Sequence, residues 1–368
     1  MPRLRWGPLV AWSALGTLIC VVLVLTNLSA TLDNLGHLVD TKPGSVAAPV
    51  LEADLGPEAV KEGGNHDGAF FYVQARNPFD LGAAAPFVDR PHYRLQRLGY
   101  PLASWLLHPT GGGWGLLWAM FAVGVLSVFF GGIGTGALSQ TWEGPSWPAV
   151  IFPTMLGSIL SLRISVADPM ALALAVWAIV AIVRGRLALA LVAGVAAALT
   201  REPILLVFVG VLLARRDRQA VALVAVPAAA VLAWGVVVRL AVQNPGEYIA
   251  EFGVPMQGIV ESGRFWAQGF EPLGLIAFVV GLAAAVAALV RRGLRHPLSW
   301  VVILQIAFLV VLKVSVLAPE RNASRAVMPM MIFGLVMLAT PAAARLTPTY
   351  GVRRLVAATP VGDREPSG

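Results

Sequence analysis

Long apolar runs separated by short polar turns are the main pattern of the chain. Roughly 17 to 25 apolar residues suffice to cross about 30 Å of hydrocarbon as a helix. The pattern predicts about ten transmembrane helices, within a safer range of roughly eight to eleven. The predicted spans are 9–28, 114–133, 147–166, 169–184, 187–200, 203–214, 219–240, 272–290, 298–317 and 326–343. The fifth and sixth are short for full crossings, so tilted, broken or re-entrant helices around 200–203 are alternatives.

Two longer polar segments, 31–113 and 243–271, interrupt the apolar runs. Within the first, residues 31–65 are rich in Gly, Pro, Asp and Glu without periodicity, which indicates an irregular loop. Residues 66–108 carry apolar side chains at helical spacing beside charged ones, which predicts interfacial amphipathic helices lying along the membrane. The segment 243–271 mixes aromatic and acidic residues, and it is either a lid over a substrate cavity or an aromatic belt at the membrane interface.

Composition supports the same class of protein. Of 368 residues, 57% are hydrophobic and 13% charged, and the mean hydropathy is +0.75, which excludes a water-soluble domain. Because hydrocarbon offers the backbone no hydrogen-bond partners, we expect an all-α polytopic membrane protein. One transmembrane domain at 1–346 and a disordered cytoplasmic tail at 347–368 are expected. Cys20 is the only cysteine, so no disulfide forms within the chain.

Arginines in the turns predict the orientation. They form clusters that alternate with the spans, so that all of them fall on one face, which the positive-inside rule makes cytoplasmic together with both termini. The clusters are Arg3/Arg5, Arg184/Arg186, Arg215/Arg216/Arg218, Arg291/Arg292/Arg295 and Arg345/Arg353/Arg354. Most carboxylates fall on the opposite, external face. The net charge of +7 is therefore a topology signal and gives no reason to expect a nucleic-acid partner.

Three charged motifs stand out on the external face. His-Asp-Gly-Ala-Phe-Phe-Tyr occupies 66–72, and Tyr-Arg-Leu-Gln-Arg-Leu-Gly-Tyr-Pro occupies 93–101. Ala-Asp-Pro at 167–169 opens a span that leads into a small-residue helix ending in Leu-Thr-Arg-Glu at 199–202. In layout and in these motifs the chain resembles bacterial members of the GT-C superfamily of membrane glycosyltransferases, which use polyprenyl-phosphate-linked sugars and include mannosyltransferases and arabinosyltransferases.

The resemblance implies a GT-C-like multi-pass enzyme of the cell membrane. Such an enzyme transfers a sugar from a polyprenyl-phosphate-linked donor to an extracytoplasmic glycan or lipid acceptor, among membrane lipids and with no nucleic acid. The reaction needs a base for the acceptor hydroxyl and cations for the phosphate leaving group. No cofactor is expected. A divalent metal is possible, but no ligand spacing in the sequence indicates one.

Asp67 is the candidate catalytic base, with a helix N-cap as the alternative. Arg94 and Arg97 lie three residues apart and could grip one phosphate from one helix face, or instead snorkel to lipid headgroups. The further donor phosphate ligands predicted are Arg201, Arg321 and Arg325. The predicted substrate contacts are His66, Tyr72, Tyr93, Asp168, Glu202 and Glu320.

Several of these residues also have ordinary structural interpretations. Arg201 and Glu202 could form a buried ion pair beside Pro203, and Asp168 could simply favour the start of its helix. Lys313 could face the same cavity. A transporter or flippase for a lipid-linked saccharide is the alternative function, but it needs polar groups near the membrane midplane. Because the charges gather at one face, the enzyme is favoured.

Overall fold

The computed structural model describes residues 3–31, 35–60, 66–246, 251–269 and 271–341. Every named element in these ranges is a helix, and the extended pairing there is limited to two isolated bridges. The predicted all-α fold is therefore confirmed. The predicted tail at 347–368 lies outside the described residues, as do short parts of both external loops.

Among the described residues, five helices are long and apolar enough to cross a membrane, as expected of a membrane protein. They are α1 (Trp6–Thr31), α7 (Trp114–Thr141), α13 (Arg218–Ala241), α15 (Pro272–Arg292) and α18 (Glu320–Ala339). Exposed apolar side chains on their outer faces, such as Leu232 and Leu240 of α13, suit contact with lipid.

The prediction of about ten full crossings is not confirmed. The further apolar helices are shorter: α10 (Asp168–Val183), α11 (Leu187–Thr200), α12 (Leu205–Arg215) and α16 (Ser299–Val311). At about 1.5 Å per residue, a helix as short as α11 extends only about 21 Å. Its 14 residues therefore fall short of the hydrocarbon thickness unless they continue into other structure.

Two predicted spans are broken. Residues 147–166 form η4 (Trp147–Val150), α8 (Ile151–Thr154) and α9 (Leu156–Arg163), because Pro148 and Pro153 lack N–H donors and Met155 is extended. The span predicted at 298–317 ends as α16 at Val311 and resumes as α17 (Val314–Leu317). Between them Leu312 pairs with Phe252 in an isolated antiparallel bridge, which the helical pattern of the sequence does not reveal.

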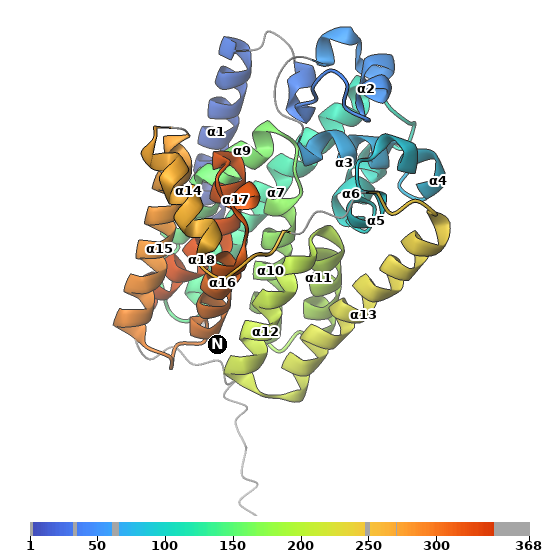
Figure 1. Ribbon diagram of the computed structural model, residues 1–368. Coiled ribbons are helices and arrows are strands. Elements are labelled where there is room, and N and C mark those ends of the chain that lie inside the picture. Colours follow the sequence, from blue (N-terminus) through green and yellow to red (C-terminus); the bar gives the residue numbers. More distant parts are fainter. Residues whose placement is uncertain (1–2, 32–34, 61–65, 247–250, 270, 342–368) are drawn as a thin grey trace, which may run out of the picture.

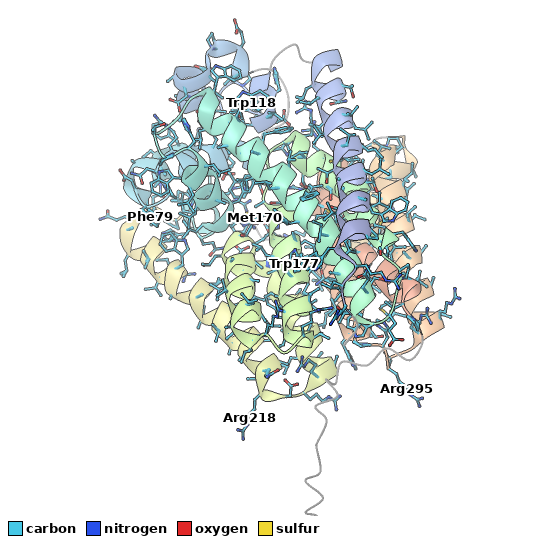
Figure 2. The ribbon with its side chains drawn as sticks, turned by 180° about the vertical axis from the view of Figure 1, so that it is seen from behind. Phe79, Trp118, Met170, Trp177, Arg218 and Arg295 are labelled. Atoms are coloured by element: carbon cyan, nitrogen blue, oxygen red, sulfur yellow. The ribbon has the colours of Figure 1, made fainter. Side chains whose placement is uncertain are left out.

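The helices pack as a bundle with two distinct ends. α7 contacts α1 and α10, α11 lies between α10 and α13, and α18 packs against α15, α16 and α9. Figure 1 shows the long helices running roughly alongside one another, with the N-terminus towards the lower end. Arg218 and Arg295 lie at this lower end in Figure 2, whereas Phe79 and Trp118 lie higher.

The upper part holds the first polar segment, folded into short helices (Figure 1). These are η1 (Leu35–Val39), α2 (Ala48–Leu55), η2 (Pro57–Ala59), α3 (Asp67–Arg76), α4 (Leu81–Ala84), η3 (Ala85–Phe87), α5 (Pro91–Arg94) and α6 (Gly99–Leu107). The prediction that α3 is an amphipathic surface helix is wrong, since every residue at 68–75 is buried. α6 does expose Leu106 and Leu107.

A short 3-10 helix, η5 (Glu202–Ile204), lies between α11 and α12. The second polar segment contains α14 (Gln257–Ala267). Trp266 of α14 is buried and donates its indole N–H to the Ala318 carbonyl at 2.9 Å. This tryptophan is a packing residue, so it does not belong to an interfacial aromatic belt.

Candidate functional site

A cavity of about 440 Å³ lies where the upper helices meet the bundle. Its wall comes from the start of α3, from α5 and the turn after it, and from α10, α16 and α18. The charged residues that line it are Asp67, Arg90, Arg94, Arg97, Asp168, Arg201, Glu251 and Arg325. Six of these were predicted from the sequence as site residues, and His66 and Tyr93 line the same cavity.

Asp67 stands at the first residue of α3, where the helix dipole favours a negative charge. The N-cap position belongs to His66, so the alternative of Asp67 as the cap does not hold. Gly68 makes this placement possible, because a Cβ at that position would collide with the carbonyl oxygen of Ile164. The close approach of backbone to backbone holds the start of α3 against the end of α9.

Three arginines surround the Asp67 carboxylate. Arg94 pairs directly with its Oδ1, Arg97 lies 3.4 Å from its Oδ2, and Arg201 lies 4.0 Å from the same oxygen. Burial alone would raise the pKa of this carboxyl, but Arg94, Arg325, Arg97 and Arg201 together hold it well below its ordinary value. Asp67 is therefore ionised and, while these ion pairs persist, has little affinity for a proton.

Arg94 and Arg97 do not reach lipid headgroups. Arg94 also bonds to Asp89 at 2.9 Å, and its guanidinium lies over the Phe70 ring. Arg97 is only 2% exposed, pairs with Glu202 at 3.3 Å and lies 4.1 Å above the Tyr93 ring. Side chains held this tightly do not snorkel, so that alternative does not hold. Desolvation favours the neutral form of each guanidinium, yet the neighbouring carboxylates keep the pKa of both above its ordinary value.

Asp168 links two further arginines. Arg201 follows α11 in an extended conformation, and its Nε lies 3.1 Å from Asp168 Oδ1. Arg325 of α18 lies 3.2 Å from the other carboxylate oxygen. The ion pair between Arg201 and Glu202, which was the structural alternative for these residues, is absent from the described contacts, because Glu202 turns towards Arg97 instead.

His66 belongs to a neighbouring cluster. Its Nε2 lies 3.2 Å from Asp40 Oδ2, and the same oxygen pairs with Arg321. Burial and the charge of Arg321 lower the pKa of His66 to about 4, so the ring is neutral near pH 7. Because the carboxylate can only accept, Nε2 carries the ring proton.

Four predicted residues lie outside the cavity lining. Tyr72 donates to Asp54 at 3.0 Å on the far side of α3, because a residue five positions after Asp67 lies about 140° around the helix from it. Glu202 lies behind Arg97, and Arg321 is taken by Asp40. Glu320 begins α18, and its backbone N–H donates to the Glu271 carboxylate at 2.5 Å. Lys313 packs on Gly253 and does not line the cavity either.

The structure adds lining residues that the sequence analysis missed. Arg90 pairs with Glu251 at 3.3 Å, which brings the second polar segment to the cavity. Neither residue belongs to a motif, so only the folded chain relates them. Gln305 was also missed, although a single polar residue within the apolar run at 300–311 is a usable signal.

The remaining wall is mostly apolar, apart from Ser315 and Asn322. It includes Leu172, Ile204, Phe252, Phe308, Leu312, Val316 and Met328. Cations beside an apolar wall at one end of a helix bundle suit an anionic group attached to an apolar chain. No group of three or more His, Cys, Asp or Glu side chains in the described part of the chain is arranged to hold a metal ion.

No family model, no curated protein and no solved structure matches the chain.

Proposed function

We propose that the protein is an integral membrane glycosyltransferase, which moves a sugar from a polyprenyl-phosphate-linked donor to an extracytoplasmic glycan or lipid acceptor. The observation that carries the proposal is a single cavity that combines an ionised Asp67, several arginines and an apolar wall. A lipid phosphate needs the cations and the apolar wall, and sugar transfer needs the carboxylate.

Arg201 is the first candidate to hold the donor phosphate. Its side chain is 25% exposed, more than that of Arg94 or Arg97, so a ligand reaches it without displacing packed residues. Arg94 and Arg325 line the same cavity and can share the phosphate charge. As the glycosidic C–O bond to the phosphate breaks, negative charge grows on the leaving oxygen, and the guanidiniums stabilise it.

Binding of the phosphate also prepares Asp67. The anion competes for the arginines that now hold the carboxylate, and its own negative charge lies nearby. Both effects raise the proton affinity of Asp67, because its low pKa depends on those arginines. The acceptor hydroxyl then gives its proton to Asp67 as its oxygen forms the new bond to the sugar, and polyprenyl phosphate leaves.

The arginine distribution supports an extracytoplasmic cavity in the cell membrane. Arg218 and Arg295 lie at the end of the bundle away from α3 and α5 (Figures 1 and 2). With the positive-inside rule, that end is cytoplasmic, and the cavity opens at the other side.

A transporter remains the alternative class, and the position of the charges argues against it. Transporters carry polar groups near the midplane, usually on paired broken helices in two halves. Here the paired charges lie at helix starts and in turns, such as Asp67, Asp168 and Arg201.

The test is transfer from labelled polyprenyl-phosphate sugars by the purified protein in liposomes. Asp67→Asn is expected to abolish transfer while donor binding persists, because the amide keeps a polar group beside the arginines but cannot take the proton. Asp217→Asn is the matched control, since Asp217 caps α13 far from the cavity and its loss should leave transfer intact. Transfer that survives in Asp67→Asn would rule out this role, and persistent donor binding excludes misfolding as the cause of lost transfer.

A further inference from the structure

The cavity extends into the bundle below the charged residues. It contacts α18 from Asn322 down to Pro329, a descent of about 10 Å along the helix. At that depth the wall is apolar, with Leu172, Phe308 and Met328 among its members. A sugar or another polar group entering this part would find few partners.

Gln305 is the exception. It belongs to α16, lines the cavity and is only 3% exposed. Its amide Nε2 is buried and finds no hydrogen-bond partner among the described residues. A buried donor left unpaired destabilises the fold, so a structure that keeps one beside a cavity invites a ligand that accepts the bond.

Pro329 also lines the cavity. It lies within α18 and has no N–H, so the carbonyl of Arg325 lacks its usual helical donor. The amide of Gln305 itself carries both a donor and an acceptor. A hydroxyl group likewise donates and accepts, and it therefore matches this amide better than an anion or an apolar chain does.

We propose that Gln305 is a binding residue for a hydroxyl of the transferred sugar, so that the cavity takes the sugar into its deep end and the phosphate at the arginines. This inference rests on the proposed function, and it names the part of the donor that each end recognises. Gln305 would then contribute to the choice among sugars, since a site built around a hydrogen bond discriminates strongly against a ligand without it.

The experiment measures the affinity of the purified protein in nanodiscs for three lipids: polyprenyl phosphate, and the same lipid carrying mannose or arabinose. Gln305→Met keeps the side-chain length and removes the donor. We expect Gln305→Met to weaken binding of at least one sugar-bearing lipid about tenfold, as the loss of one buried hydrogen bond implies, and to leave the bare lipid phosphate unaffected.

Thermal stability separates this role from a structural one. Gln305→Met should unfold at the same or a higher temperature, because it removes an unpaired polar group. The matched control is Gln74→Met, since Gln74 is equally buried but donates to the Leu95 carbonyl at 3.0 Å and should lower the melting temperature. Equal weakening of all three lipids, or unchanged binding of both sugar-bearing lipids, would overturn the role of Gln305. Failure of the wild type to bind any of the three would instead refute the proposed function.

Discussion

Each arginine that lines the cavity has a carboxylate partner within the protein. Arg90 pairs with Glu251, Arg94 with Asp67 and Asp89, Arg97 with Asp67 and Glu202, and both Arg201 and Arg325 with Asp168. Buried ion pairs of this kind are costly to break from one side, because the remaining charge is left without a partner in a poorly solvated place. The arginines nevertheless differ in exposure, and this difference separates structural from ligand-binding roles.

Arg97 and Arg201 allow a direct comparison of the two roles. Arg97→Ala should lower the free energy of unfolding by about 3 to 5 kcal/mol, because it leaves Glu202 and part of Asp67 unpaired in a buried place. Arg201→Ala should cost less than about 1 kcal/mol, since Asp168 keeps Arg325. Chemical denaturation in detergent measures both. Equal losses of unfolding free energy in the two variants would contradict this difference in roles. Arg201→Ala should also weaken donor binding, although it changes stability little.

Most of the charged residues that line the cavity stand out in the sequence, but their ion-pair partners do not. Asp67, Arg94, Arg97 and Arg201 were found because charges next to apolar spans are conspicuous. Glu202 and Arg321 were misplaced, since their partners lie far away in the chain and only folding brings them together. The role of each residue within the proposed reaction stays a prediction.

At the scale of helices, the sequence predicts where apolar structure lies better than where it breaks. α11 begins and ends as predicted, because Arg186 and Arg201 bound an uninterrupted apolar run. The break at Leu312 has no local signal, since the Phe252 bridge that holds it comes from another segment. The buried position of α3 was missed for a similar reason: α6 and α7 cover the face that its sequence would expose.

The contact between α3 and α9 sets the position of Asp67. Gly68→Ala should destabilise the protein by about 1 to 3 kcal/mol and reduce transfer, because the added methyl group forces the start of α3 away from the Ile164 carbonyl. Gly7→Ala in α1 is the matched control, since a Cβ there meets nothing within 4 Å. Melting temperature and transfer rate are the measurements. A Gly68→Ala protein with wild-type values for both would show that this close approach does not position the site.

At the scale of the whole molecule, the turns that carry Arg218 and Arg295 lie at the lower end of the bundle, whereas Met170, two residues after the cavity residue Asp168, lies well above them (Figure 2). The positive-inside rule, applied to the arginines of the short turns, predicts from the sequence that these turns share one face. It does not establish how many helices cross completely, because α10, α11 and α16 are apolar but short.

Labelling of single cysteines tests the orientation. In a Cys20→Ala background, Phe79→Cys should react with a membrane-impermeant maleimide on intact cells, whereas Arg295→Cys should react only after the membrane is opened. The reason is that Phe79 is exposed and follows α3, the helix that begins at the cavity residue Asp67, whereas Arg295 lies lower, at the arginine-rich end. The reverse pattern would place the cavity in the cytoplasm and exclude an extracytoplasmic acceptor.

The ion pair between Asp67 and Arg94 also bears on turnover. A site that holds a lipid phosphate through several cations risks retaining its product, since polyprenyl phosphate keeps its charge after the sugar has gone. Asp67 supplies an internal competitor for the same guanidinium. As the product departs, Asp67 releases the proton that it took from the acceptor to water, and the ion pair re-forms and offsets the lost contacts. The empty cavity is then a stable end point of each cycle, and product inhibition is weakened.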